Sequence, residues 1–322
     1  MNPDGFLRDV RGEPEALGRV LDAYGRDRGP PAALGHEPLR GRRVVLIGMG
    51  SSRFAALTCA AGLRGRGIPA VAEYASTATP TPPHPDVMAV GISASGKTPE
   101  TVEALGRHRG ISRTVAVTNV PDGPLGAVVD VVLPLFAGEE EGGIACRTYQ
   151  TTLAVLHLLG GVDAGRLSAA ATAQERLLTG SATWAPELLD TLDGAHTVYA
   201  IAPAERLSSA LQSALVLREG PRIPAAASET GDWLHVDVYL TKRPGYRALL
   251  FPGSRFDGEV MRWAAERACT IVPLGRSVER AKSCVPFDGA GDPLVASLVE
   301  VSVAELVAGL WWQRRVRTGV MP

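Results

Sequence analysis

The chain has few cysteines, few aromatic residues and almost no net charge. Its four cysteines, Cys59, Cys146, Cys269 and Cys284, stand far apart in 322 residues and form no Cys-x-x-Cys pair. This spacing argues against a disulfide framework and a common zinc site, so we expect reduced structural thiols. The 33 basic and 34 acidic residues give a net charge of -1 without a basic stripe, which argues against a nucleic-acid partner.

Long apolar runs are also missing. No uncharged apolar stretch of about 18 residues occurs, and residues 1–11 are polar where a secretory signal needs an apolar core. We therefore expect a cytoplasmic protein that does not bind a membrane. Hydrophobic residues still make up 45% of the chain, which is enough for ordinary buried cores, and the length suits two domains.

Strand and helix patterns alternate along the chain, and the same order occurs twice. The strands read as solid apolar blocks, which is typical of parallel sheets covered on both faces. In the first half we expect strands at 44–48, 70–74, 87–92, 114–118 and 128–133, with helices at 51–66, 98–108 and 146–159. In the second half we expect strands at 197–202, 248–251 and 270–273, with helices at 164–192, 204–218, 257–267 and 293–317.

This order predicts an α/β protein with two doubly wound parallel-sheet domains built to one plan. We place a helical N-terminal extension at 1–40, a first domain at 41–165 and a second domain at 166–322. The extension contains a helix at 14–24 and a linker rich in glycine and proline at 28–37.

The segment Gly91-Ile92-Ser93-Ala94-Ser95-Gly96-Lys97-Thr98 joins an expected strand to an expected helix. Its hydroxyl side chains would lie at a helix N-terminus, where free N–H groups and the helix dipole favour an anion. The alternative is an ordinary turn in which these hydroxyls only cap the helix. The local residues do not separate the two interpretations.

A second turn of this kind, Gly48-Met49-Gly50-Ser51-Ser52, closes the first expected strand. It resembles half of a dinucleotide-binding fingerprint, and Glu73 follows at a spacing suited to a ribose. Arg53, however, stands where the third glycine belongs, so a nicotinamide-dependent dehydrogenase is a weak alternative.

Together the two turns and the segment 137–148 resemble the SIS (sugar isomerase) module, whose fold is flavodoxin-like. The whole chain is similar to the paired SIS domains in the isomerase half of glutamine:fructose-6-phosphate amidotransferase. The family motif S-Q-S-G-E-T-x-D-T corresponds to S-A-S-G-K-T-P-E-T at 93–101.

The resemblance implies a sugar-phosphate site without a metal or an organic cofactor. Its phosphate would be held by Ser52, Ser93, Ser95 and Thr98. Ala94 replaces a glutamine that helps to hold the phosphate, and Lys97 replaces a glutamate. Further possible substrate contacts are Gly50, Ser51, Ala94, Lys97 and Ala145.

Glu219 ends an expected helix just before Gly220 and Pro221. An acid at a helix C-terminus is unfavourable for the dipole, which hints at a role other than capping, although a solvated helix-end carboxylate is the alternative. The resemblance makes Glu219 the base that moves a proton between C1 and C2 of an open-chain sugar. A buried carboxylate with a raised pKa would suit this work.

His235 follows Glu219 at the spacing of the family motif. The resemblance implies that His235 acts in ring opening at the site of a neighbouring subunit, and hence that the protein is a homodimer with shared active sites. Glu229 and Asp232 are candidates for orienting the imidazole or the sugar hydroxyls. A structural histidine beside Trp233 is the alternative for His235, and the other five histidines match no family motif.

The chain also departs from the family. Val216 replaces a lysine, and the glutaminase domain and the lysine-bearing C-terminal tail are missing from the sequence, which disfavours glucosamine 6-phosphate synthesis. We therefore expect an isomerase-type enzyme that abstracts the C2 proton of a hexose or hexosamine 6-phosphate. The alternatives are a deaminase or lyase (dehydratase) of an amino-sugar 6-phosphate such as N-acetylglucosamine 6-phosphate, and a sensor without turnover.

Overall fold

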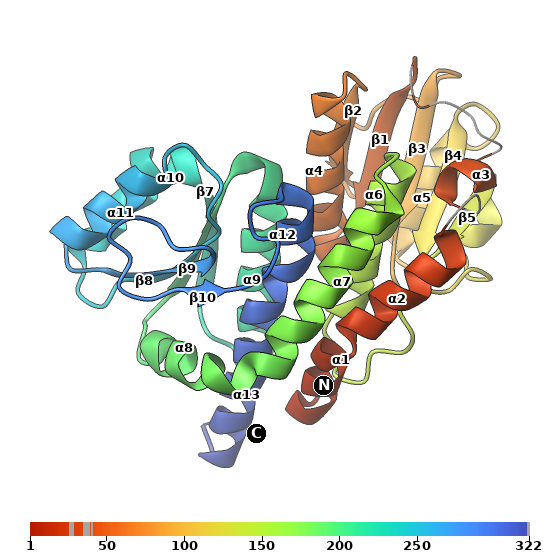
Figure 1. Cartoon of the computed structure of the whole chain (residues 1–322). Coiled ribbons are helices and arrows are strands. Elements are labelled where there is room, and N and C mark those ends of the chain that lie inside the picture. Colours follow the sequence, from red (N-terminus) through yellow and green to blue (C-terminus); the bar gives the residue numbers. More distant parts are fainter. Residues whose placement is uncertain (26–28, 35–38, 40, 321–322) are drawn as a thin grey trace. The chain divides into compact units, whose positions relative to one another are not determined.

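The computed structural model describes residues 1–25, 29–34, 39 and 41–320. They form two compact units, each with its own sheet. The first-sheet unit comprises Glu15–Glu139 and Arg147–Ser168, and the second-sheet unit comprises Met1–Pro14, Glu140–Cys146 and Ala169–Pro322. Helices flank each sheet (Figure 1), so the predicted α/β fold with two doubly wound sheets is confirmed.

The first sheet has five parallel strands in the order β2-β1-β3-β4-β5. Its strands are β1 (Arg43–Gly48), β2 (Ala70–Tyr74), β3 (Val87–Ile92), β4 (Arg113–Thr118) and β5 (Val131–Pro134). All six residues of β3 are buried, as expected of a central strand covered on both faces. Its helices are α3 (Pro30–Ala33), α4 (Gly50–Gly65), α5 (Pro99–His108) and α6 (Arg147–Leu159). Helices α2 (Glu13–Tyr24) and α7 (Ala164–Thr179) contain residues of both units.

The second sheet repeats this plan, with the strand order β10-β9-β8-β6-β7. Its strands are β6 (Val198–Ala202), β7 (Ala225–Glu229), β8 (Arg247–Leu250), β9 (Thr270–Gly275) and β10 (Val285–Pro286). Its helices are α1 (Pro3–Arg11), α8 (Ala185–Leu192), α9 (Leu207–Glu219), α10 (Thr230–His235), α11 (Asp257–Glu266), α12 (Pro293–Val299) and α13 (Val301–Arg317). In both sheets the strand order reverses beside the first strand, at β1/β3 and at β6/β8.

Several elements differ from the sequence-based expectation. The expected helix at 164–192 is two helices, α7 and α8, joined by a 3-10 turn at Gly180–Thr183. Helix α1 and strands β7 and β10 were not expected, and β5 starts later than expected, after a 3-10 turn at Gly126–Val128. Arg28 and residues 35–37 of the expected linker lie outside the described residues.

The stretch Pro293–Arg317 is apolar and long enough to cross a membrane, with a mean hydropathy of 1.8 in its most apolar window. However, 94% of that window is buried inside the protein. Helices α12 and α13 are therefore core helices, which explains their apolar composition.

Candidate functional site

Three hydroxyl groups converge where β3 ends and α5 begins. Ser93 directly follows β3 and is only 3% exposed. Its Oγ lies 2.9 Å from the Thr98 Oγ1 and 3.5 Å from the Ser95 Oγ. The three side chains that the sequence singled out in this turn are thus brought together.

The turn that carries these hydroxyls has a fixed backbone. Gly96 adopts a φ of 64°, and a Cβ there would lie 2.9 Å from the Thr118 Oγ1. The Leu125 N–H donates to the Gly96 carbonyl at 2.9 Å, and the Asn119 N–H donates to the Ala94 carbonyl at 3.1 Å. Glycine is therefore required at position 96, and the neighbouring loop holds the turn in place.

The first turn of α5 has no side-chain cap. Thr98 is the N-cap residue, yet its hydroxyl makes no capping hydrogen bond and instead faces Ser93. Thr98 therefore does not cap the helix, although the Lys97 N–H donates to the Ser95 Oγ at 3.5 Å within the turn. The free N–H groups and the positive end of the helix dipole leave this turn suited to an anion.

The second serine-containing turn lies beside the first. Strands β1 and β3 are neighbours in parallel register, with Ile47 opposite Gly91, so both strands end at the same edge. Ser51 and Ser52 lie in the first turn of α4, after Gly50 with a φ of 50°, and this helix also lacks a side-chain cap. We call Ser52, Ser93, Ser95 and Thr98 the cradle. It lies at the point where the strand order reverses, the usual ligand position in open α/β sheets.

The other residues of these turns contribute differently. Ala94 presents no polar side-chain atom, and Lys97 is exposed. The dehydrogenase alternative needs the Glu73 carboxylate to bind a ribose. In the structure this carboxylate instead accepts hydrogen bonds from the backbone N–H and the hydroxyl of Thr81.

Glu219 is the last residue of α9, a helix that is buried along 212–217. Its side chain is exposed, in contrast to the buried carboxylate that the sequence suggested. Partial burial nevertheless raises the pKa of the Glu219 carboxyl, while the charge of Arg218 lowers it. The Glu219 carboxyl is thus partly shielded from water but still accessible to a substrate, as a general base must be.

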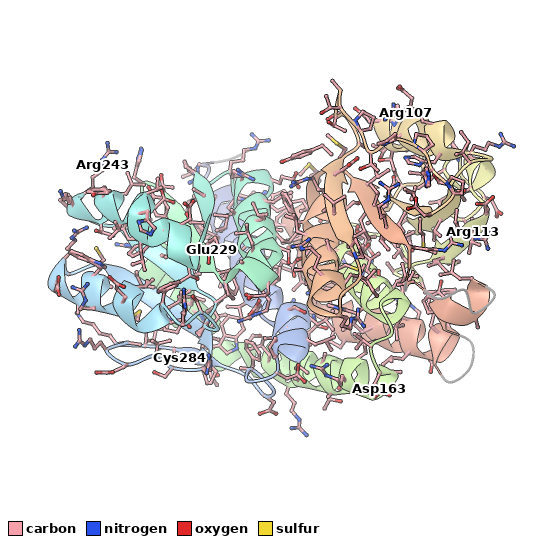
Figure 2. All side chains as sticks on the ribbon, turned by 90° about the horizontal axis from the view of Figure 1, so that it is seen from above. Arg107, Arg113, Asp163, Glu229, Arg243 and Cys284 are labelled. Atoms are coloured by element: carbon pink, nitrogen blue, oxygen red, sulfur yellow. The ribbon has the colours of Figure 1, made fainter. Side chains whose placement is uncertain are left out.

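His235 ends the short helix α10 and is exposed. This helix is anchored by Trp233, which is fully buried and donates from Nε1 to the Tyr246 hydroxyl at 2.8 Å. Glu229, labelled in Figure 2, accepts the Asp232 N–H at 2.8 Å and so caps α10. The Glu229 carboxylate therefore has a structural role as the N-cap of α10. Asp232, in the first turn of the same helix, is exposed.

Ala145 belongs to a loop, 140–146, that is tied to the helix of Glu219. The Gln212 side chain on α9 donates from Nε2 to the Ala145 carbonyl at 2.8 Å. The Cys146 N–H donates to the Glu140 Oε1 at 2.8 Å and closes the loop. The sequence analysis did not single out Gln212, although this residue lies two turns before Glu219 on the same helix.

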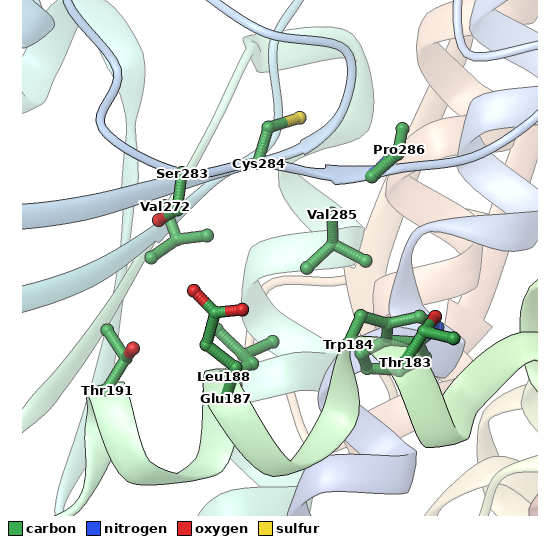
Figure 3. Close-up of a pocket in the computed structure, with 10 residues that line it drawn as sticks. All are labelled: Thr183, Trp184, Glu187, Leu188, Thr191, Val272, Ser283, Cys284, Val285 and Pro286. Carbon is green, nitrogen blue, oxygen red and sulfur yellow. The ribbon is translucent and has the colours of Figure 1, made fainter.

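A pocket of about 240 Å³ lies elsewhere in the second-sheet unit, between α8 and the segment 283–286 (Figure 3). It is lined by residues such as Glu187, Leu188 and Cys284, and none of the predicted site residues is among them. Burial raises the pKa of the Cys284 thiol, so this cysteine is not an activated nucleophile. The cradle is the better candidate because its polar groups converge.

Comparison with known proteins supports the resemblance seen in the motifs. Residues 40–160 match the family described as the SIS domain. An isomerizing glutamine-fructose-6-phosphate aminotransferase of Pyrobaculum aerophilum is 31% identical over 257 residues, which cover 74% of this chain and 42% of that protein. The chain thus spans about two fifths of the length of the curated relatives it matches.

Solved structures share the fold over nearly the whole chain. The C-terminal domain of glucosamine-fructose-6-phosphate aminotransferase from Francisella tularensis has a TM-score of 0.81 at 15% identity, covering 97% of this chain and 99% of that one. A glucosamine-6-phosphate deaminase from Thermotoga maritima has a TM-score of 0.73 at 17% identity, covering 97% and 95%. The predicted relationship to the isomerase half of the aminotransferase is confirmed.

Proposed function

We propose that this chain, an SIS-domain protein, binds a hexose or hexosamine 6-phosphate in its cradle and transfers a proton at C2 of the open-chain sugar. The observation that carries the proposal is the convergence of Ser93, Ser95 and Thr98 at the uncapped start of α5, where the strand order reverses. Hydroxyls, free N–H groups and a helix dipole are the groups that hold a phosphate without a metal.

Glu219 is the proposed base. Its carboxylate takes the proton from the carbon next to the carbonyl, and the electron pair of the broken C–H bond moves onto the carbonyl oxygen as an enediolate forms. Return of the proton to the neighbouring carbon exchanges aldose and ketose. The raised pKa of Glu219 makes the carboxylate a stronger base than an ordinary surface glutamate, which supports this role.

His235 is the proposed group for ring opening, acting in the site of a partner subunit. The exposed imidazole and the exposed apolar side chains that follow it suit a subunit contact: Val236 is 58% exposed and Tyr239 is 63% exposed. The homodimer is therefore part of the proposal.

Deamination or dehydration of an amino-sugar 6-phosphate is the second candidate, because it starts with the same proton abstraction. One observation favours it over glucosamine 6-phosphate synthesis. Val216, where the family has a lysine, is fully buried on α9, so this position offers no amine for imine chemistry.

The test is to incubate the protein in deuterated water with the 6-phosphates of fructose, glucose, glucosamine and N-acetylglucosamine and to follow C2 and new products by NMR. We expect exchange at C2 in at least one sugar and its loss in Glu219→Gln. Glu266→Gln, a change at the end of α11, is the matched control and should retain exchange.

Three outcomes are informative. Exchange that persists in Glu219→Gln contradicts the assigned base. Loss of ammonia or water from an amino sugar identifies the second candidate. Thermal stabilisation by a sugar phosphate without exchange or turnover indicates a sensor.

A further inference from the structure

The Arg53 side chain on α4 has no counter-ion among the residues that the structure describes. It forms no ion pair and no side-chain hydrogen bond with any of them, and its Nε is enclosed without an acceptor. The other two arginines near the far end of this helix are engaged, Arg64 with the Ala70 carbonyl and Arg66 with the Gly160 carbonyl. The Arg53 side chain is thus charged and partly buried. Unlike Arg64 and Arg66, it has no carbonyl acceptor among the described residues.

The guanidinium of Arg53 is held over an aromatic ring at the edge of the sheet that carries the cradle. Its Cζ lies 3.7 Å from the centre of the Tyr74 ring. Tyr74 ends β2 and is opposite Gly48, the last residue of β1, so the ring stands at the same edge as the cradle turns. Arg53 also directly follows Ser52 of the cradle in the first turns of α4.

Stacking occupies only the face of a guanidinium. The N–H groups of a guanidinium lie in its plane, so those left free by stacking can still donate, and a pair of them matches two oxygens of a phosphate. Glu73, the acid next to Tyr74 in the chain, does not compete for Arg53, because its carboxylate accepts hydrogen bonds from Thr81. Lys97 lies exposed in the other turn, and no acid in the described part of the chain is bonded to it.

We propose that Arg53 is a further ligand of the substrate phosphate and supplies the charge and donors that Ala94 does not. This inference rests on the proposed function, because it takes the cradle as the phosphate site. Tyr74 then acts as a positioning residue that orients the guanidinium. The phosphate would be held by hydroxyls and N–H groups from two turns and by the edge of one arginine.

The test is calorimetric titration of inorganic phosphate into the full chain and into three variants. Arg53→Gln should weaken binding by about tenfold or more, the loss expected for a charge-assisted hydrogen bond. Arg64→Gln is the matched control, because it removes the same charge from the same helix at its other end, and it should bind like the wild type. Ser93→Ala reports on the cradle itself and should also weaken binding.

A second pair of variants tests the orienting role of the ring. Tyr74→Phe keeps the aromatic face and should retain phosphate affinity, whereas Tyr74→Leu removes the face and should lose part of it. Circular dichroism and thermal melting of each variant show that the chain is folded before titration. A fall in affinity for Arg53→Gln that also appears in Arg64→Gln reflects net charge alone and overturns the assignment.

The remaining outcomes separate the two proposals. If the wild type binds no phosphate, the cradle is wrong and the Arg53 assignment falls with it. If the wild type binds and Ser93→Ala loses affinity while Arg53→Gln does not, only the Arg53 assignment is overturned.

Discussion

Glu13 and Glu305 place two carboxyl groups together in the interior of the second-sheet unit. Both side chains are fully buried. The Glu13 Oε2 accepts from the Gln174 Nε2 at 2.8 Å and from the Ser302 hydroxyl at 2.7 Å. Burial raises the pKa of Glu305 to about 7, and burial together with the charge of Glu305 raises the pKa of Glu13 well above its usual range. The pair therefore holds its protons to a higher pH than solvated glutamates would.

This pair makes stability depend on pH in a direction that can be tested. Because the folded pKa of Glu305 lies above the unfolded value of 4.5, the folded chain binds more protons between these two values. The free energy of unfolding should fall as pH rises through this interval and then flatten with respect to Glu305. Urea denaturation between about pH 5 and about pH 8 measures the slope.

Glu305→Gln should reduce that slope, since the amide carries no titrating proton. The exposed Glu279 gives a control, and Glu279→Gln should leave the slope unchanged. An unaltered slope in Glu305→Gln would show that other groups cause the pH dependence.

The proximity of the three hydroxyls at the start of α5 was predictable, because they belong to one short segment. Ser93, Ser95 and Thr98 lie within one turn, and the strand and helix around it have clear patterns. Arg53 and Tyr74 were not predicted as a pair, because only the parallel register of β1 and β2 brings them together. The exposure of Glu219 depends on what covers the end of α9, which a sequence pattern does not report.

At the scale of elements, α1 clamps the loop 140–146. The Gly142 N–H donates to the Asp9 carboxylate at 2.7 Å, and Arg8 pairs with Glu141 at 2.6 Å. A Cβ on Gly142 would lie 2.4 Å from the Phe6 Cα, so the loop backbone passes directly against the helix. Ala145, a possible substrate contact, belongs to the loop that is held in this way.

Gly142→Ala should therefore be costly. The new methyl group meets backbone atoms that cannot rotate away, and we expect a loss of about 2 kcal/mol or more in the free energy of unfolding. Gly62→Ala is the matched control, because a Cβ at this exposed position of α4 has no neighbour within 4 Å. It should stabilise the protein by about 0.5–1 kcal/mol. Equal effects of the two changes in urea denaturation would contradict the clamp.

Helices and strands with a clear hydrophobic pattern were predicted well. Those that form only because of tertiary contacts were not predicted. Strand β7 reads Ala-Ala-Ala-Ser-Glu, which has low strand propensity and is a strand because it pairs with β6. Helix α1 is short and polar in composition, and its few apolar residues, including Phe6 and Val10, are buried on one face. The long helical pattern at 164–192 did not show where the chain turns between α7 and α8.

At the scale of the whole molecule, the two sheets share one strand order but differ at the point of reversal. In the second sheet the Arg206 side chain lies at this point. It pairs with Glu300 and donates to the Pro252 carbonyl at 2.6 Å. Both side chains are buried, at 5% and 1% exposure. A phosphate would have to displace this pair, which supports placing the proposed phosphate site in the first sheet.

The proposed homodimer predicts complementation between inactive variants. If His235 acts in the partner's site, a dimer of one Glu219→Gln and one His235→Ala subunit contains one site with both wild-type groups. Mixing and reassembling the two variants in equal amounts should restore about a quarter of wild-type activity. Each variant reassembled with itself is the control and should stay inactive. A lack of recovery in a mixture that sedimentation shows to contain dimers would contradict the shared site.

The packing of α1 on α13 has a consequence for the order in which the protein folds. Phe6 and Trp312 have ring centroids 6.4 Å apart, and a Cβ on Gly309 would lie 2.6 Å from a Leu7 side-chain atom, so the two helices are in close contact. During synthesis the first-sheet unit is complete once Ser168 has emerged. Helix α1 cannot pack against α13 until α13 has been translated, and its apolar face stays exposed until then. The second-sheet unit is thus the late-folding half of the chain and the one that depends most on protection from aggregation.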